Sequence, residues 1–401
     1  MRKLSQLRKI FHFNPTCELA IANGSPHYQA PAILREFEEE LAPILLLFAS
    51  ANDHVLKERP LPDQFIERMR ELGLSSAPCM SKVQSLEVLT SEPVLLQPWG
   101  WSPAALNFLA TYEQPTEIRK QHQQIVNSDL FQRKHAVRFV NDFLDDNPQP
   151  FFPRKEERPQ LLDSLDAIDR YLFKHQQIVL KSPLSSSGRG LQVIRKNELN
   201  DSNRRWIKTT LAQQNYLVAE PLFNKRADLS FQFELKPSGE IVFLGISHFK
   251  TNNNGQYLGH HINPPTDLAY PYFQQDELTT IANRLTDQLR KSYFQSLYHG
   301  FLGIDALVYG VGREIKIQPC LEINPRLNMG ILSQAIAQKI HPESSGMFLT
   351  YYDPGKSYKE FVEEQAKKNP LIVRDQRLRK GFLSLTAPKN DSLFGAYLLL
   401  S

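Results

Sequence analysis

Short apolar runs alternate with segments of helical periodicity along the first third of the chain. Four runs are short enough to be buried strands, at residues 10–14, 42–49, 87–90 and 93–99. Of these, APILLLFA at 42–49 is equally typical of a buried helix. Residues 61–74, LPDQFIERMRELGL, place apolar side chains at helical spacing. This alternation predicts an α/β layer over residues 1–125.

The rest of the chain changes pattern and predicts longer helices and antiparallel strands. Helices are expected at 115–144 (one or two), 161–175, 276–298 and 356–369. Strands are expected on both sides of a Gly/Ser loop at 176–196, through 215–260, and near the end at 381–388 and 395–401. Residues 300–324 read as two strands joined by a glycine-containing turn, which is the pattern of a hairpin.

Composition and charge narrow the class of protein. The 401 residues are 41% hydrophobic and 22% charged, which is typical of a globular protein with two or three domains. The formal net charge of +4 is too mild to indicate a nucleic-acid partner. The most apolar run is too short to span a bilayer, and the basic start lacks the apolar core of a signal peptide. Three cysteines without metal-binding spacing fit a reducing, cytoplasmic setting.

The stretch VLKSPLSSSGRGLQVI is the first candidate for binding chemistry. Lys181 ends an apolar strand, and the loop that follows holds three serines and two glycines. The backbone N–H groups of such a loop can close over phosphates, and Lys181 supplies a positive charge for one of them. A plain flexible hairpin loop explains these residues equally well, and neither GxxxxGK[ST] nor GxGxxG is present.

A second candidate is LVAEPLFNKRADLSFQF, residues 217–233. Glu220 ends an apolar strand, and a strand-to-turn segment of this kind can present backbone groups to an adenine edge. Asp228 could accept hydrogen bonds from ribose hydroxyls. Taken alone, the stretch is better explained as a strand edge with surface acids.

The third candidate is CLEINPRLNMG, residues 320–330. Side chains at alternate strand positions share a face, so Cys320, Glu322 and Asn324 point the same way. If IDALVYG is the partner strand, Asp305 lies near them, and two carboxylates with an amide oxygen suit Mg²⁺. Arg326 follows two residues later and can hold a phosphoryl or carboxylate group. A simple salt bridge from Arg326 would leave the three polar groups on one strand face unexplained, because burying them without a cation is costly.

Taken in order, VLKSPLSSSGRG, VAEPLF, GIDALVY and LEINPRLNMG resemble the ATP-grasp superfamily of ATP-dependent ligases. The resemblance covers about residues 130–345 and implies a fold of mixed α/β and α+β type. It implies an N-terminal Rossmann-like pre-ATP-grasp domain at 1–125, a first ATP-grasp lobe with the phosphate loop at 126–215, and a second lobe with the metal site and a C-terminal extension at 216–401.

The resemblance also implies roles for individual residues. Lys181 would bind phosphate under a loop formed by Ser185, Ser186, Ser187, Gly188 and Gly190. Lys134 is the candidate for a second phosphate-binding cation, with Arg133 as the alternative. Glu220 and Leu222 would lie at the adenine, and Asp228 near the ribose. Asp305, Glu322 and Asn324 would hold Mg²⁺, and of these the acid on the first strand, Asp305, is the one whose position varies in the superfamily. Arg326 would stabilise the transferred phosphoryl group.

The implied reaction activates a carboxylate as an acyl phosphate, with release of ADP, and then couples it to an amine. ATP and Mg²⁺ are the implied cofactors, with two ions expected and Mn²⁺ as a substitute. The partners would be a small-molecule carboxylate and amine, and a homodimer is the default assembly. Two other functions stay open, an ATP-grasp kinase that phosphorylates a small molecule and a non-catalytic ATP-binding protein. The intact set of site residues disfavours the latter.

Two further segments carry weaker signals. The polar segment 245–265 could contact the γ-phosphate through Lys250 or a substrate through His248 or Tyr257, and a solvated hairpin tip fits it equally well. In the first domain, Asn14 and Glu18 are weak candidates for a substrate or phosphate contact. Trp99 and Trp101 are expected to be packing residues.

Overall fold

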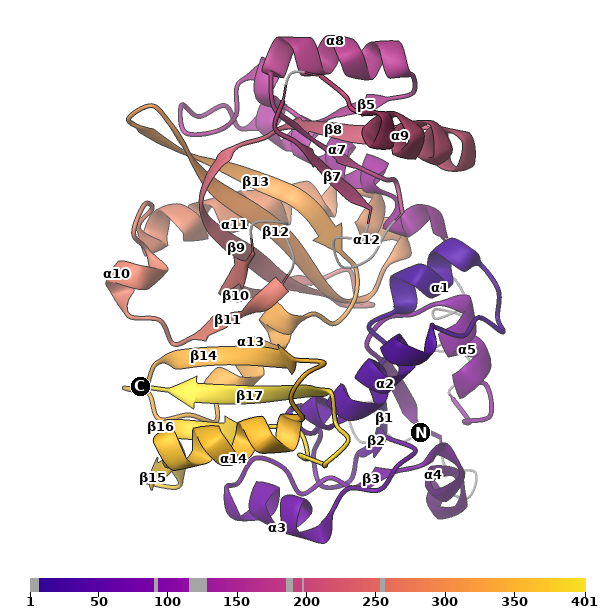
Figure 1. Cartoon of the computed structure of the whole chain (residues 1–401), viewed down its shortest axis with the longest axis vertical. Coiled ribbons are helices and arrows are strands. Elements are labelled where there is room, and N and C mark those ends of the chain that lie inside the picture. The colour runs from indigo at the N-terminus through magenta and orange to yellow at the C-terminus, as the bar shows by residue number, and fades with distance from the viewer. Residues whose placement is uncertain (1–6, 90–92, 115–127, 185–189, 197, 253–256) are drawn as a thin grey trace. The chain divides into compact units, whose positions relative to one another are not determined.

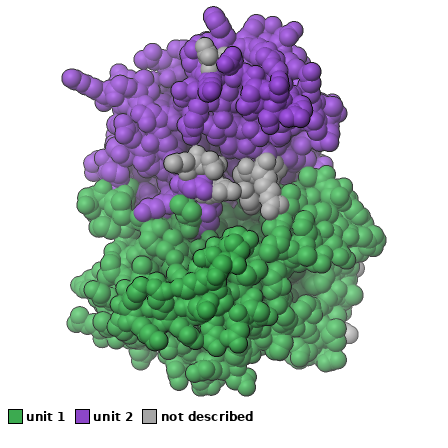
Figure 2. Space-filling model, viewed as in Figure 1, with its two compact units in different colours: residues 1–126, 258–269, 326–401 green, residues 127–257, 270–325 purple. Residues whose placement is uncertain are grey.

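The chain forms two compact units, each built from segments that are distant in the sequence (Figure 2). The computed structural model describes residues 7–401 except 90–92, 115–127, 185–189, 197 and 253–256. Unit 1 comprises residues 1–126, 258–269 and 326–401, and unit 2 comprises residues 127–257 and 270–325. Among the described residues, no helix is long and apolar enough to cross a membrane.

Unit 1 begins with a parallel sheet in the order β3-β2-β1-β4 (Figure 1). Its strands are β1 (Lys9–His12), β2 (His54–Leu56), β3 (Cys79–Met80) and β4 (Leu95–Pro98). Its helices are α1 (Cys17–Asn23), α2 (Ala32–Leu41), η2 (Ala42–Leu47), α3 (Asp63–Glu71), α4 (Lys82–Leu89) and α5 (Pro103–Leu109). The predicted α/β layer is confirmed. Because the strands are parallel, the residues that follow β1 and β4 meet at one edge of the sheet.

One of the predicted strands in this layer is wrong, and the run at 42–49, for which strand and helix were both open, is helical. Residues 42–47 form the buried 3₁₀ helix η2, which has a proline in its first turn. Residues 87–89 end helix α4, where Ser85 and Leu89 are buried and Val88 is exposed. Burial at i and i+4 is the helical period, and the run of only four residues at 87–90 is too short to reveal it.

A second sheet of unit 1 is antiparallel, in the order β11-β14-β17-β16-β15. Its strands are β11 (Tyr257–Ile262), β14 (Gly346–Tyr352), β15 (Ile372–Arg374), β16 (Arg377–Ser384) and β17 (Phe394–Leu400). The helices nearby in sequence are α10 (Thr266–Ala269), α13 (Met329–Ala337) and α14 (Tyr358–Lys368). Helix α2 joins the two sheets, because the Phe37 and Phe394 rings meet edge to face at 5.3 Å and the Phe394 N–H donates to Glu40 at 2.8 Å.

Unit 2 contains a small antiparallel sheet, β5-β8-β6-β7, covered by two helices. Its elements are β5 (Gln160–Leu162), α8 (Leu165–His175), β6 (Ile178–Lys181), β7 (Leu191–Ile194), α9 (Asp201–Gln214) and β8 (Leu217–Pro221). Apolar residues of α8 and α9 pack with those of β6 and β8 in one buried cluster. The predicted helix at 161–175 and the predicted strand, loop and strand at 176–196 are confirmed in the residues described.

The larger part of unit 2 is the antiparallel sheet β13-β12-β9-β10. Its strands are β9 (Asn224–Leu235), β10 (Ile241–Thr251), β12 (Gly300–Val311) and β13 (Glu314–Asn324). Its helices are η3 (Ser128–Phe131), α7 (Arg133–Asp146), η4 (Lys155–Glu157), α11 (Gln275–Arg290) and α12 (Tyr293–Leu297). The predicted hairpin is confirmed, and Gly312 turns it with a φ of 60° that favours glycine. The predicted single helix over 276–298 is wrong, because Ser292 has extended backbone angles and ends the first helix.

Candidate active site

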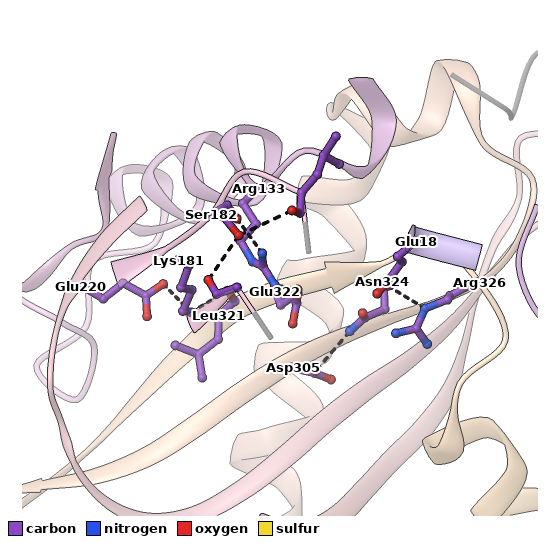
Figure 3. A network of polar contacts seen from close by, with 12 residues as sticks. Glu18, Arg133, Lys181, Ser182, Glu220, Asp305, Leu321, Glu322, Asn324 and Arg326 are labelled. Atoms are coloured by element: carbon purple, nitrogen blue, oxygen red, sulfur yellow. Dashed lines mark hydrogen bonds and ion pairs between the residues drawn. The ribbon is translucent and has the colours of Figure 1, made fainter. Parts of the chain in front are cut away.

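The hairpin of β12 and β13 brings three predicted metal ligands together. In the strand register Asp305 lies directly opposite Glu322, and Gly303 lies opposite Asn324. The Asn324 Nδ2 donates to the Asp305 Oδ2 at 3.0 Å (Figure 3). Directly opposite side chains on an antiparallel pair are neighbours on one face of the sheet. Two carboxylates and an amide therefore converge at this end of the hairpin, as the spacing predicted.

Arg133 lies against this group, and Lys134 does not. Arg133 is the first residue of α7, and its Nη2 meets the Glu322 Oε1 at 2.6 Å (Figure 3). Its Nη1 donates to the Ser182 carbonyl at 2.7 Å. Lys134 instead pairs with Asp129, and its side chain is more exposed. Of the two cations weighed from the sequence, the structure places the alternative, Arg133, at the acidic residues.

Lys181 forms a buried ion pair at the end of β6. Its Nζ lies 2.8 Å from the Glu220 Oε1, and the two side chains are 10% and 6% exposed. The same Nζ reaches the Leu321 carbonyl on β13 at 3.4 Å, so Lys181 links the small sheet to the hairpin (Figure 3). Two predicted nucleotide residues, one proposed for phosphate and one for adenine, thus contact each other directly.

The glycine–serine loop is described only at its two ends. The Ser182 N–H donates to the Gly190 carbonyl at 2.8 Å, which closes the base of the loop. Gly190 is therefore placed next to the end of Lys181's strand. Ser185, Ser186, Ser187 and Gly188 lie outside the described residues.

The remaining predicted nucleotide residues lie on or after β8, β9 and β10. The Leu222 N–H donates to the Gln177 carbonyl at 3.0 Å, which ties the segment after β8 to the start of β6. The Asp228 Oδ2 accepts from the Lys225 Nζ at 2.7 Å and from the Thr251 Oγ1 at 2.8 Å. Lys250 is exposed near the end of β10.

Arg326 belongs to unit 1, where Glu18 holds it. The Arg326 Nε donates to the Glu18 Oε1 at 2.8 Å, and Glu18 lies in the first turn of α1 (Figure 3). Asn14 does not face a ligand, since its side chain exchanges hydrogen bonds with the backbone of Gly100 at 2.8 and 3.3 Å. Gly100 is needed there, because a Cβ would lie 2.3 Å from the Cys17 Sγ. The pairing of Glu18 with Arg326 was not predicted.

Three other residues singled out in the sequence are buried or make ring contacts. Trp99 is buried, with its ring edge to face with Phe13 at 5.0 Å. His248 packs edge to face on Tyr270. Burial raises the pKa of the Cys320 thiol well above its usual range, and the nearby carboxylates Asp305, Glu220 and Glu322 act in the same direction. A thiol held protonated is a poor nucleophile and a poor metal ligand.

The donors on the hairpin fit Mg²⁺ better than a softer metal. Among the described residues, no group of three His, Cys, Asp or Glu side chains could hold a metal ion. The hairpin set is two carboxylates and an amide, all oxygen donors, which suits an ion that keeps several waters. Like charges directly opposite each other on two strands are destabilising, so Asp305 and Glu322 favour a bound cation between them. Arg133 offsets part of this repulsion.

Known structures resemble the whole chain at low sequence identity. No family model matches the chain, and no curated protein matches it. Biotin carboxylase from Campylobacter jejuni, solved with β,γ-ATP, has a TM-score of 0.51 and 13% identity over 99% of this chain and 88% of its own. The biotin carboxylase domain of 2-oxoglutarate carboxylase from Hydrogenobacter thermophilus, solved with MgADP, ADP and bicarbonate, has a TM-score of 0.50 and 11% identity over 98% of this chain and 86% of its own.

A likeness at this level of identity shows the fold alone. Both neighbours are ATP-grasp enzymes, and they match nearly the entire length of the chain. The predicted class, an ATP-grasp fold preceded by an N-terminal α/β domain, is confirmed. The chain therefore has the ATP-grasp fold.

Proposed function

We propose that the protein is a Mg²⁺-dependent, ADP-forming ligase that activates a small-molecule carboxylate as an acyl phosphate and couples it to an amine. The observation that carries the proposal is the hairpin, where Asp305 lies opposite Glu322 and contacts Asn324 while Arg133 pairs with Glu322. A cation between two carboxylates, with a second cation in reach, is the arrangement that phosphoryl transfer requires.

In this proposal ATP is a substrate that lies along one face of the β13-β12-β9-β10 sheet. Glu220 and Leu222, at and after the end of β8, lie at the adenine, and Asp228 lies near the ribose. Lys181, Arg133 and the loop that starts after Ser182 contact the phosphates, with Lys250 as a further cation. Arg133 replaces Lys134 as the proposed second cation, because its guanidinium already reaches Glu322.

The residues of the hairpin would hold Mg²⁺, with Asp305, Glu322 and Asn324 as protein ligands. When bound, the ion neutralises negative charge on the phosphates and orients them. Arg133 and Lys181 contribute positive charge that is already in place before the reaction, so little reorganisation is needed as charge moves. Mn²⁺ would substitute through the same oxygen ligands.

The first step transfers the γ-phosphoryl group of ATP to the substrate carboxylate. One carboxylate oxygen forms a bond to the γ-phosphorus, and the bond to the β,γ-bridging oxygen breaks to release ADP. Arg326 stabilises the transferred group, since it follows the last residue of β13 by two positions and its Nε is anchored on Glu18. A guanidinium fixed at one edge keeps its remaining donors in a defined orientation.

The second step forms the new bond to nitrogen. The amine attacks the acyl carbon, the bond to the phosphate oxygen breaks, inorganic phosphate leaves and the amine loses a proton. No side-chain nucleophile takes part, which agrees with the high pKa of the Cys320 thiol. The substrates are small molecules, a homodimer is the proposed assembly, and the domain boundaries at residues 125 and 215 stay predictions.

The test is ADP release from Mg-ATP in the presence of pooled amino acids and small carboxylates, with hydroxylamine added. ADP together with a hydroxamate supports carboxylate activation, and subdividing the pool identifies the donor. ADP with a stable phosphorylated product and no hydroxamate contradicts the ligase and indicates a kinase. The matched control is Glu322→Gln, which keeps the size of the side chain and removes one proposed metal ligand.

A further inference from the structure

Gln318 on β13 has a buried amide group without a partner. Its side chain is fully buried, and neither its Oε1 nor its Nε2 has a hydrogen-bond partner among the described residues. Leaving such a group dry and unpaired costs the full desolvation of the amide. Gln232 on β9 is buried to the same degree and also leaves its Oε1 unpaired, but its Nε2 donates to Ser230 at 2.9 Å and to Ser247 at 3.1 Å. The unpaired amide of Gln318 therefore needs an explanation.

The strand register places Gln318 on the same face as the proposed metal ligands. Gln318 lies opposite Leu307 and Glu322 lies opposite Asp305. Between these pairs β12 has one residue and β13 has three. Because both numbers are odd, Gln318 and Glu322 stay on the same face of the sheet across the bulge. Leu307 in turn lies opposite Asp228 on β9. Gln318, Leu307 and Asp228 thus form a row across the sheet, next to the row that contains Asp305 and Glu322.

The segment that follows β8 lies over this row. The Phe223 ring stacks on Tyr309 at 4.1 Å, and Tyr309 is the next residue after Leu307 on this face of β12. At the other end of the segment, Glu220 pairs with Lys181, and the same Lys181 Nζ reaches the carbonyl of Leu321, three residues from Gln318 on β13. Gln318 therefore lies between two contacts made by residues 220–223, the segment proposed to meet adenine.

We propose that Gln318 recognises the base of the bound nucleotide through its side-chain amide, an inference that rests on the proposed ATP site. An amide offers a donor beside an acceptor, and adenine presents its 6-amino donor beside a ring-nitrogen acceptor, so the two can form a pair of hydrogen bonds. Guanine presents two acceptors, O6 and N7, on the corresponding edge, which leaves one of them unpaired. Gln318 is thus a specificity-determining residue that favours ATP over GTP.

A bound ligand and a buried water are the two explanations for the unpaired amide of Gln318. A buried water could also satisfy Gln318, and it would then act as part of the structure. The two explanations differ in what happens when the amide is replaced by an apolar group of similar size. Removing an unpaired buried amide relieves its desolvation cost, whereas removing an amide bound to structural water loses hydrogen bonds.

The experiment compares wild type with Gln318→Leu by calorimetric binding of Mg-ATP and Mg-GTP and by thermal unfolding without nucleotide. We expect the Kd for Mg-ATP to rise about 10- to 100-fold and the preference for ATP over GTP to shrink. We expect the melting temperature without nucleotide to stay level or rise. Gln318→Met repeats the test with an unbranched side chain in case the leucine variant does not fold.

Gln288→Leu is the matched control, because Gln288 is a buried glutamine on α11 outside the proposed nucleotide site. It should leave the Kd for Mg-ATP unchanged. A lower melting temperature for Gln318→Leu, with ATP affinity and base preference unchanged, would overturn this inference and assign the residue to structural water. Failure of the wild-type protein to bind any nucleoside triphosphate would instead overturn the proposed function, and this inference with it.

Discussion

Two ion pairs connect the elements around the hairpin, and they differ in their exposure to solvent. Lys181 and Glu220 meet at 2.8 Å with side chains 10% and 6% exposed. Arg133 and Glu322 meet at 2.6 Å, but the Glu322 side chain is 35% exposed. Both pairs join residues far apart in the sequence, and both involve residues proposed to meet ATP or its metal ion.

The difference in exposure indicates different roles. Charges that are fully buried lose their hydration, so neither Lys181 nor Glu220 can give up its partner cheaply. Glu322 keeps contact with water and can exchange Arg133 for another cation at small cost. We infer that the buried pair fixes the geometry of the site, and that the exposed pair is the part that rearranges when a metal ion and phosphates bind.

The largest effect is expected on stability when the buried pair is broken. Lys181→Met leaves Glu220 charged and buried, which should lower the free energy of unfolding by about 3–5 kcal/mol. Urea denaturation measures the loss. Adding Glu220→Gln to Lys181→Met removes the orphaned charge and should recover much of it. A single variant as stable as wild type would show that water reaches Glu220.

The free energies of unfolding of these variants and wild type should be compared above pH 6.5, because the stability of unit 1 depends on pH below that value. Burial, with help from Lys82, lowers the pKa of His12 from 6.5 to about 4. Between pH 6.5 and pH 4 the imidazole of His12 is protonated in the unfolded chain and neutral in the folded protein. Its contribution to the free energy of unfolding is therefore fully present above pH 6.5 and is lost as the pH falls toward 4. A shift from 6.5 to about 4 corresponds to a loss of at most about 3 kcal/mol.

His12→Phe tests this source of pH dependence. The substitution keeps a ring beside Phe108, on which His12 stacks at 4.7 Å, and removes the titrating group. Unfolding measured by urea at pH 4.5 and pH 7 should then show a smaller difference than in wild type. An equal difference would assign the pH dependence to other residues.

Breaking the exposed pair should affect function more than stability. Glu322→Gln keeps the shape of the side chain and should change the free energy of unfolding by less than about 1 kcal/mol. Loss of a proposed metal ligand should lower Mg-dependent ATP turnover by at least about 100-fold, more than the loss of a residue that only supports a ligand. Steady-state ADP release at several Mg²⁺ concentrations measures this, and unchanged turnover would contradict the metal assignment.

The smallest effect separates the two neighbouring cations of α7. Arg133→Met should raise the KM for ATP about 10-fold, because one charge-assisted contact to the phosphates is lost. Lys134→Met should leave the KM unchanged, since Lys134 pairs with Asp129 at a more exposed position. A larger effect from Lys134 than from Arg133 would restore the original assignment.

The choice between Arg133 and Lys134 shows how far the sequence could have gone. The buried residues of α7 include Ala136, Val137 and Val140, at positions three, four and seven after Arg133. Arg133 therefore begins the apolar stripe that packs on the sheet, while Lys134 shares a face with the exposed Arg138 and Asp142. Helical periodicity alone favours Arg133, whereas the resemblance to the superfamily favours the lysine at 134.

Other features had no sequence signal. The pairing of Glu18 with Arg326 joins residues 308 positions apart, and no local pattern relates them. Gln318 looks like an ordinary polar residue in a strand until burial shows that its amide is unpaired. The helix break at Ser292 also escaped prediction, and the sequence left strand and helix open at 42–49, because a serine and a short apolar run fit several backbone conformations.

The sequence by itself determined the hairpin and the clustering of the three proposed metal ligands on it. Alternation at period two places Glu322 and Asn324 on one strand face wherever that strand lies, and the glycine-containing turn brings Asp305 opposite them. Only the tertiary structure decided which cation meets Glu322, which ion pair is sealed from water, and which buried amide is left unpaired. These depend on contacts between elements distant in sequence and on exclusion of solvent, and neither is a property of any local stretch of chain.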